Sequence, residues 1–278
     1  MLETSPHDAS TLYLDLLKKT LTRWGQDEIA RVRPDNFLKR GLATIIESKN
    51  LEIVRRSPFD ARARESGLDH PKDAETMIGL KRLDNLEECI RTVVAEDVPG
   101  DLIETGVWRG GGSIFMRAVL RSLNAGHRVV WCADSFEGLP APDLEKYPQD
   151  RHAAKWHEMA HLRVSLEQVR ENFKKYDLLD DHVRFLKGWF KNTLPTAPIE
   201  RLSILRLDGD LYESTMDALE ALYHKLSPGG FAIIDDYGMV EPTCRSAVHD
   251  FRDRNGISSP IVDIDGNGAF WRKDAGTG

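Results

Sequence analysis

From residue 101 to residue 234 the chain alternates short apolar runs with segments that carry helical patterns, and this alternation constrains the fold most. Short apolar strands separated by helices are typical of a mainly parallel sheet that is covered on both faces. The sequence therefore predicts an α/β fold. We expect strands at 101–105, 128–133, 183–186, 202–207 and 231–234, and helices at 113–123, 166–176 and 214–226.

The helix expected at 214–226 has the clearest pattern. Ser214 and Asp217 have the spacing of a capping box, which predicts that the helix begins at Ser214. Pro228-Gly229-Gly230 follows and is expected to end it. One apolar stripe runs along the helix and consists of Met216, Leu219, Leu222, Tyr223 and Leu226.

The C-terminal part of the chain has the pattern of a β-hairpin. After a helix expected at 244–254, apolar runs at 261–264 and 269–272 flank Asp265-Gly266-Asn267-Gly268, a strong turn sequence. An antiparallel hairpin that ends an otherwise parallel sheet is unusual for a nicotinamide-binding fold. It is the expected end of the Rossmann-like sheet of class I methyltransferases.

The rest of the chain divides into an extension, a core and a tail. Residues 1–75 are expected to form a helical extension, and a long amphipathic helix at 77–94 leads into a core domain that spans 76–272. Residues 273–278 form the tail. The segment 140–162 is long, polar and contains prolines, which is typical of a lid or a disordered loop.

Composition excludes several classes of partner. The net charge of −7 and the absence of a basic block argue against nucleic acid as the partner. The 3 cysteines are far apart and odd in number, so we expect neither a disulfide framework nor a Cys-x-x-Cys metal clip. No apolar stretch is long enough for a membrane span, and no signal-peptide core is present. We expect a cytoplasmic protein with a small-molecule ligand.

A glycine-rich turn follows the first expected strand of the core. Glu104, Gly106 and Gly110 to Gly112 lie between this strand and a helix, where ligands bind in doubly wound folds. The spacing is not G-x-G-x-x-G, and Gly112 stands where a phosphate-binding loop needs its lysine. Glu104 suits an amino group, and Asp134 at the next strand end suits paired ribose hydroxyls. Together they indicate an amino-acid nucleoside, S-adenosylmethionine.

Aspartates gather at the ends of two further strands. Asp208 and Asp210 follow one strand, while Asp235 and Asp236 follow the next. A right-handed crossover places such strand ends side by side, so four carboxylates are expected to share a crevice. A hard divalent cation relieves their repulsion and lowers the pKa of a coordinated hydroxyl. We expect Asp208, Asp235 and Asp236 to bind the metal, and Asp208 or Asp210 to act as general base.

An alternative reading uses the segment His157-Glu158-Met159-Ala160-His161, which satisfies the H-E-x-x-H pattern of zinc proteases. Both histidines would share one face if this stretch were helical, and the chain would then be a zinc hydrolase. The stretch lies in a polar connection and lacks an evident third ligand. A solvated lid or a substrate contact is the preferred interpretation.

With these residues in place, the chain resembles the macrocin and mycinamicin O-methyltransferase family between about residues 76 and 272. These bacterial enzymes methylate deoxysugar hydroxyls on macrolides and related glycosides. The matching stretches are Thr76-Met-Ile-Gly-Leu-Lys-Arg-Leu, Glu104-Thr-Gly-Val-Trp-Arg-Gly-Gly, Ala133-Asp-Ser-Phe-Glu-Gly, Gly188-Trp-Phe-Lys, Leu205-Arg-Leu-Asp-Gly-Asp-Leu-Tyr-Glu-Ser-Thr-Met-Asp and Asp235-Asp-Tyr.

The resemblance implies roles for individual residues. It implies that Asp208, Asp235 and Asp236 hold Mg²⁺. It also implies a homodimer or larger homo-oligomer whose N-terminal helices help to cover a glycoside acceptor. The residues implied to surround the methyl donor are Thr76, Met77, Glu104, Ser113, Asp134, Ser135, Gly188 and Trp189, with Gly106 in the turn between them.

Two regions depart from the family pattern. The run after Tyr237 differs, and residues 138 to 162 match poorly. Because this segment and the N-terminal extension are where acceptor contacts are expected, the sequence leaves the acceptor open. A phenol or catechol is the alternative to a sugar hydroxyl.

Overall fold

The computed structural model describes residues 9–32, 37–69, 71–238 and 243–274, and its centre is a seven-stranded sheet. The strand order is β5-β4-β3-β6-β7-β9-β8, with β9 antiparallel to both of its neighbours and the remaining pairs parallel. The α/β fold with its terminal hairpin is confirmed. The strands are β3 (Asp101–Thr105), β4 (Val130–Asp134), β5 (Val183–Lys187), β6 (Leu202–Leu207), β7 (Leu226–Ile234), β8 (Val262–Asp263) and β9 (Ala269–Arg272).

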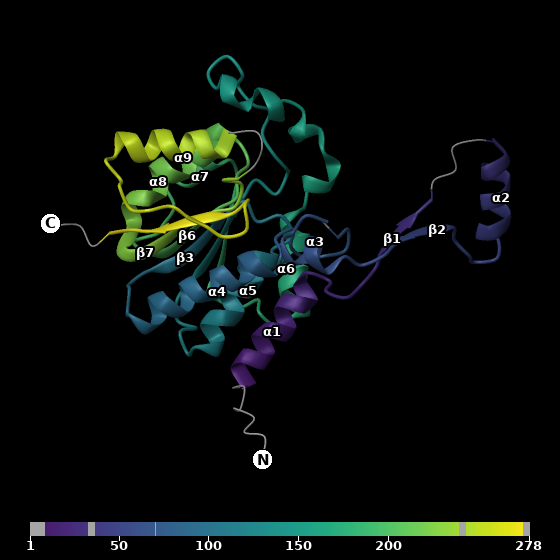
Figure 1. The fold of residues 1–278 in the computed structure, drawn as a ribbon, viewed down its shortest axis with the longest axis horizontal. Helices are drawn as coiled ribbons and strands as arrows, with labels where there is room; N and C mark the ends of the chain where they lie inside the picture. Colours follow the sequence, from purple (N-terminus) through teal and green to yellow (C-terminus); the bar gives the residue numbers. More distant parts are fainter. Residues whose placement is uncertain (1–8, 33–36, 70, 239–242, 275–278) are drawn as a thin grey trace.

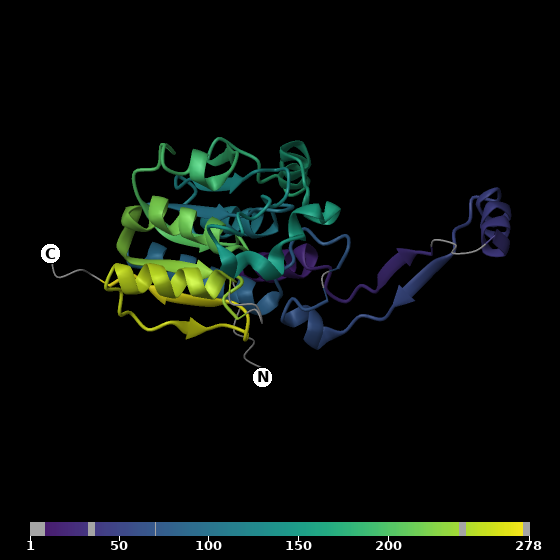
Figure 2. The same ribbon diagram turned by 90° about the horizontal axis from the view of Figure 1, so that it is seen from above.

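Helices cover both faces of this sheet (Figures 1 and 2). Side chains on a strand point alternately to opposite faces, so Leu102 of β3 joins one hydrophobic core and Ile103 joins the other. The first core includes α4 (Leu80–Ala95), α5 (Gly111–Ser122) and α6 (Leu166–Lys175), and the second includes α8 (Tyr212–Leu222) and α9 (Thr243–Arg254), with the short α7 (Phe190–Thr193) beside α8.

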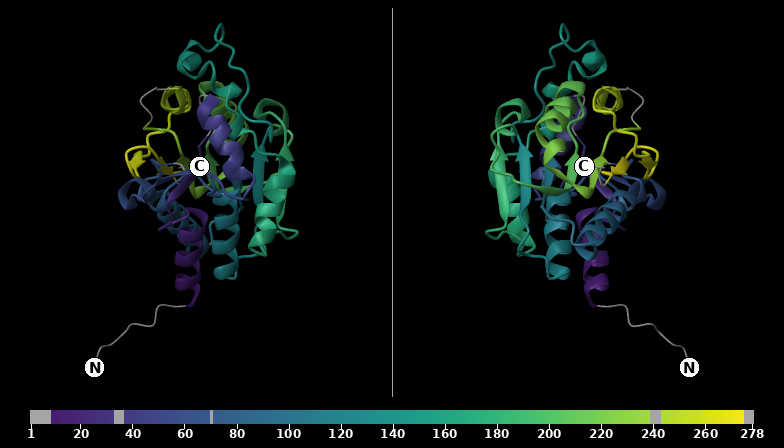
Figure 3. Two further views of the ribbon diagram at one scale, coloured as in Figure 1. Left: turned by 90° about the vertical axis from the view of Figure 1, so that its right-hand side faces the viewer. Right: turned by 90° about the vertical axis from the view of Figure 1, so that its left-hand side faces the viewer.

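The N-terminal residues contain strands as well as helices. Helix α1 (Ala9–Leu21) lies against α5 and α4, and buries Leu14, Leu17 and Leu21 in the first core (Figures 1 and 3). Beyond it, β1 and β2 pair antiparallel and extend away from the sheet, which the sequence did not predict. The elements of this extension are β1 (Glu28–Arg31), α2 (Phe37–Glu47), β2 (Val54–Ser57) and α3 (Ala61–Glu65).

The helix predicted at 214–226 is present, but both signals expected to set its ends, the cap at Ser214 and the stop at Pro228-Gly229-Gly230, are wrong. Helix α8 begins at Tyr212, and Ser214 lies within it without a capping hydrogen bond. It ends at Leu222, a 3₁₀ turn over Tyr223–Lys225 follows directly, and Pro228-Gly229-Gly230 belongs to β7. The glycines sit in a strand because Lys273 pairs with them: the Gly229 amide donates to the Lys273 carbonyl, and the Lys273 amide donates to the Gly230 carbonyl, both at 2.8 Å.

None of the helices in the described parts of the chain has the length and apolar character that a bilayer crossing requires.

The segment 138–162 is ordered. It forms the 3₁₀ turns Pro148–Ala153, Trp156–Glu158 and Ala160–Leu162, and it is the teal segment at the top of Figure 1.

Candidate active site

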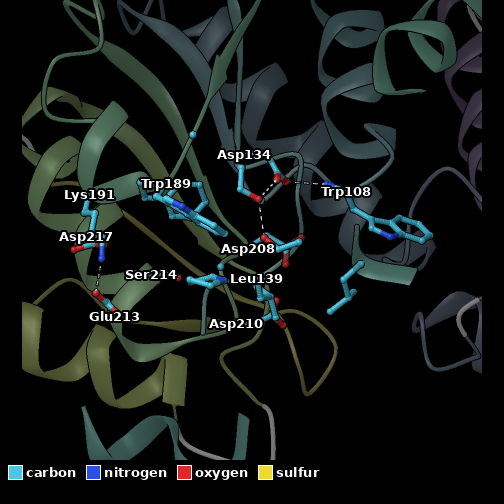
Figure 4. A pocket seen from close by; sticks show the side chains of 18 of the residues that line it. Trp108, Asp134, Leu139, Trp189, Lys191, Asp208, Asp210, Glu213, Ser214 and Asp217 are labelled. Atoms are coloured by element: carbon cyan, nitrogen blue, oxygen red, sulfur yellow. Dashed lines mark hydrogen bonds and ion pairs between the residues drawn. The ribbon is translucent and has the colours of Figure 1, made fainter. Parts of the chain in front are cut away.

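A pocket opens at the carboxyl ends of β3, β4, β5 and β6, where an α/β sheet binds its ligands (Figure 4). Trp108 and Trp189 stand on opposite sides of it, with Asp134 and Asp208 between them. Its lining residues are Met77, Gly106, Trp108, Asp134, Ser135, Gly138, Leu139, Pro140, Ala141, Leu162, Gly188, Trp189, Phe190, Lys191, Asp208, Gly209, Asp210, Glu213, Ser214 and Asp217.

The glycine turn after β3 makes room for other parts of the chain. Gly106 has φ +93°, and a Cβ atom there would lie 1.6 Å from the carbonyl oxygen of Asp208. A Cβ atom on Gly112 would lie 2.3 Å from Glu104 Oε1. The turn therefore holds the ends of β3 and β6 in contact, and any side chain at position 106 would push them apart.

Asp134 is held by the backbone of that same turn. Its Oδ2 accepts hydrogen bonds from the amides of Val107 at 2.7 Å and Trp108 at 3.3 Å, and its Oδ1 accepts one from the Phe136 amide at 2.7 Å. Burial nevertheless raises the pKa of Asp134. The carboxylate lines the pocket as a fixed hydrogen-bond acceptor, which suits hydroxyl groups.

The predicted donor residues divide into two sets. Six of them line the pocket: Met77, Gly106, Asp134, Ser135, Gly188 and Trp189. The other three, Thr76, Glu104 and Ser113, are buried and are not part of its wall. Instead of pointing into the pocket, Glu104 accepts hydrogen bonds from the Ser113 hydroxyl and from Arg206, and burial raises its pKa to about 7.

Asp208, Asp235 and Asp236 come together as predicted. One oxygen of each lies within 4.8 Å of the others, at the adjoining ends of β6 and β7. Asp236 Oδ2 is buried and has no hydrogen-bond partner among the described residues. Burial and the neighbouring Asp235 raise the pKa of Asp208 to about 6, while burial and the neighbouring Asp210 and Asp208 raise that of Asp236 well above its ordinary value.

Asp210 lies beside this group and lines the pocket. It adopts a left-handed backbone conformation with φ +58°, which is strained for a residue with a side chain. Burial and the charge of Asp208 raise its pKa to about 8.

Two buried arginines, which the sequence did not single out, hold these carboxylates in place. Arg206 Nη1 donates to Glu104 Oε1 and to Asp208 Oδ2, each at 2.8 Å, and its Nη2 donates to Asp235. Arg82 Nη1 donates to Asp235 Oδ2 at 2.6 Å. Although burial opposes ionisation, Arg82 and Arg206 keep the pKa of Asp235 below its usual value. A signal existed: Arg206 interrupts the apolar run 202–207, and a charge inside such a run needs partners.

The site contains more carboxyl groups than arginines, so its charge is compatible with a bound cation. The two guanidinium groups form ion pairs with four carboxyl groups, namely Glu104, Asp208, Asp235 and Asp265. Asp210 and Asp236 add two more carboxyl groups beside them. Burial raises the pKa values of Asp208, Asp210 and Asp236, and the neighbouring negative charges raise them further. A hard divalent ion takes carboxylate oxygen ligands and would satisfy the unpaired Asp236 oxygen, so the residues fit such an ion.

The zinc-hydrolase alternative is contradicted by the backbone. Residues 157–161 do not form an α-helix, because two separate 3₁₀ turns, Trp156–Glu158 and Ala160–Leu162, meet at Met159. His157 and His161 therefore do not share a helical face. Within the described ranges, neither histidine belongs to a group that could hold an ion.

Comparison with known proteins gives consistent matches over nearly the whole chain. The family model described as macrocin-O-methyltransferase (TylF) matches residues 10–273. The 8-demethyl-8-(2,3-dimethoxy-alpha-L-rhamnosyl)-tetracenomycin-C 4'-O-methyltransferase of Streptomyces olivaceus is 54% identical, covering 96% of this chain and 95% of its own. The mycinamicin III 3''-O-methyltransferase of Micromonospora griseorubida is 48% identical, covering 98% and 100%. The structure of the O-methyltransferase NovP matches with a TM-score of 0.81 and 44% identity, covering 95% and 99%.

Proposed function

The chain belongs to the macrocin O-methyltransferase family, and from that premise we propose that it transfers the methyl group of S-adenosylmethionine to a sugar hydroxyl of a glycosylated natural product, with Mg²⁺ bound by Asp208, Asp235 and Asp236. The names of the relatives support a glycoside acceptor, since one acts on a rhamnosyl tetracenomycin and another on mycinamicin III. The observation that carries the metal assignment is the buried oxygen of Asp236, which has no hydrogen-bond partner within the described ranges and lies beside two other aspartates.

The donor fits the side of the pocket formed by β3, β4 and β5. Asp134 offers a carboxylate to the paired ribose hydroxyls, and Gly188 and Trp189 follow β5 beside it. The indole of Trp189 offers an aromatic surface to the adenine. Glu104 and Ser113 act indirectly in this proposal, because Glu104 binds Arg206 and Ser113 binds Glu104. Thr76 also acts indirectly, since it is buried and packs against Gly111 in the glycine turn.

The acceptor fits beside the aspartates. When bound, Mg²⁺ lowers the pKa of an acceptor hydroxyl at the site. Asp208 or Asp210 takes the proton from that hydroxyl, since both line the pocket. The oxygen then attacks the sulfonium methyl group, the bond between sulfur and the methyl carbon breaks, and S-adenosylhomocysteine leaves. The arginines keep Glu104, Asp208 and Asp235 in position throughout.

The test is a mass-spectrometric screen. Purified protein with S-adenosylmethionine and Mg²⁺ is incubated with a rhamnosylated aromatic polyketide, a macrolide glycoside, an aminocoumarin glycoside and a panel of catechols. The proposal predicts a mass gain of one methylene on a glycoside, with loss of transfer in EDTA and its return with added Mg²⁺. Methylation of catechols alone would overturn the sugar acceptor, and full activity in EDTA would overturn the metal.

We further propose that residues 1–75 form contacts between copies of the chain in a homodimer or larger assembly. Several large apolar side chains of this region are exposed, including Leu16 of α1, Ile29 of β1 and Val54 of β2. Light scattering coupled to size-exclusion chromatography tests this: a monomer at micromolar concentration would contradict it.

A further inference from the structure

The segment 138–162 connects two parts of the site. Its two ends line the pocket, through Gly138, Leu139, Pro140 and Ala141 at one end and Leu162 at the other. Near its second end, the His161 carbonyl accepts a hydrogen bond from Trp108 Nε1 at 2.8 Å. Between these ends the chain reaches α8 and α9. The segment is therefore attached both at the pocket and at the helix that follows Asp208.

Asp150, in the middle of this segment, caps α8. Its side chain is completely buried, although the surrounding segment is polar. Oδ1 accepts a hydrogen bond from the Tyr212 amide at 2.7 Å, and Oδ2 accepts one from the Glu213 amide at 3.3 Å. These are the first two amides of α8, which has no capping bond from its own N-cap residue, Leu211. A helix start needs such acceptors, and here a distant residue supplies them.

The turn between Asp208 and α8 depends on that cap. Asp210 has a positive φ, so the turn is strained and must be held by its surroundings. On one side the Thr243 hydroxyl donates to the Asp210 carbonyl at 2.8 Å. On the other side Asp150 fixes the first turn of α8, and the ring of Tyr147 lies 5.6 Å from that of Tyr212. The turn that carries Asp210 therefore lies between the hydrogen bond from Thr243 and the Asp150 cap.

We propose that Asp150 is a positioning residue that couples the docking of segment 138–162 to the placement of Asp208 and Asp210 beside the acceptor. This inference rests on the proposed function. When the segment is docked, its ends close the pocket wall and its middle fixes the aspartate turn. When it is undocked, the first amides of α8 lose their acceptors and the turn loses its support.

The variants are Asp150→Ala, Asp150→Asn and a matched control, Asp143→Ala. Asp143 lies in the same segment and accepts a hydrogen bond from the Lys146 amide at 3.1 Å, but it is exposed and its contact is local. Asp150→Asn keeps one acceptor oxygen and so can keep one of the two bonds. We expect a graded effect, largest for Asp150→Ala, smaller for Asp150→Asn and absent for Asp143→Ala.

Two measurements on the full-length protein test whether Asp150 is a positioning residue. Asp150→Ala should lower kcat about tenfold or more while leaving the dissociation constant of S-adenosylmethionine within about twofold. Hydrogen exchange without substrates should speed up at residues 208–216 in this variant and stay unchanged in Asp143→Ala. A merely structural role would lower the melting temperature and leave the kcat of the folded fraction intact.

Unchanged exchange at 208–216 in Asp150→Ala would overturn the inference, and so would an equal loss of kcat in Asp143→Ala. The exchange measurement needs no acceptor. If no glycoside is methylated, the proposed function fails, while faster exchange at 208–216 still supports the coupling between the segment and the turn.

Discussion

The donor side of the pocket and its acidic side differ in how their carboxylates are satisfied. On the donor side, Asp134 accepts three backbone hydrogen bonds from residues that directly follow β3 and β4. On the acidic side, Asp236 keeps a buried oxygen without a partner in the described structure, and Asp208 and Asp210 have raised pKa values. The comparison teaches that the donor-side carboxylate is satisfied by the chain itself, whereas the acidic side has the charge and the free oxygen that the proposed cation would satisfy.

The largest expected effect comes from the acidic side. Asp208→Asn removes a metal ligand and a candidate base, so we expect methyl transfer to fall about 1,000-fold, as the loss of several kcal/mol of metal-ion stabilisation implies. Calorimetry should still show S-adenosylmethionine binding close to that of the wild type. As a control, Asp253→Asn alters an exposed aspartate of α9 and should change neither quantity. Unchanged turnover and Mg²⁺ dependence in Asp208→Asn would contradict the metal assignment.

The next largest effect is expected from a substitution that disturbs the contact between the donor side and the acidic side. Gly106→Ala places a Cβ atom where the Asp208 carbonyl lies, so we expect about 100-fold lower turnover together with weaker donor binding and a lower melting temperature. Gly25→Ala is the matched control, because Gly25 also has a positive φ, of +77°, but has no atom near the position of a Cβ. The free energy of unfolding of Gly25→Ala should fall by only about 1–2 kcal/mol, the cost of the left-handed conformation for a residue with a side chain. Equal losses in the two variants would show that backbone strain alone matters at Gly106.

A smaller effect is expected on the donor side. Asp134→Ala removes an acceptor for the ribose hydroxyls, and the loss of hydrogen bonds to a charged group should raise the dissociation constant of S-adenosylmethionine about tenfold or more. Binding of Mn²⁺, a stand-in for Mg²⁺, should stay within about twofold. If Mn²⁺ binding falls as far as donor binding, the two sides are not independent.

The smallest effects concern the histidines. His157→Ala and His161→Ala should each leave turnover within about twofold, because neither imidazole lines the pocket and the hydrogen bond from Trp108 goes to the His161 backbone carbonyl, which the substitution keeps. Turnover assays in the presence and absence of added Zn²⁺ check this. A loss as large as that of Asp208→Asn would restore the zinc interpretation.

The sequence predicted the sheet well, because its signals are local. The strands at 101–105 and 202–207 have the predicted bounds, since each has apolar residues at its centre and is followed directly by a turn sequence that contains glycine. The helix ends near Ser214 and Pro228 were wrong for the opposite reason. The cap of α8 comes from Asp150, and the partner of Gly229 and Gly230 is Lys273, so both ends depend on residues far away in the chain.

The candidate site shows the same division. Strand ends and chain connectivity were enough to bring Asp208, Asp235 and Asp236 together. The role of Arg82 was missed because an arginine in an amphipathic helix gives no local sign of partners. The charge of Arg206 inside an apolar strand signals that it has partners, but the local sequence does not say which residues they are. Glu104 was expected to meet the donor's amino group, and only the packed structure shows it bound by Arg206 and Ser113.

The most direct test of the central claim is calorimetric titration of Mn²⁺ into the metal-free protein without any donor or acceptor. We predict that the wild type binds a single Mn²⁺ ion per chain and that Asp236→Asn, which removes the charge of the unpartnered carboxylate, abolishes this binding while the protein keeps its fold by circular dichroism. A wild type that binds no Mn²⁺, or an Asp236→Asn variant that binds it equally well, would contradict the account.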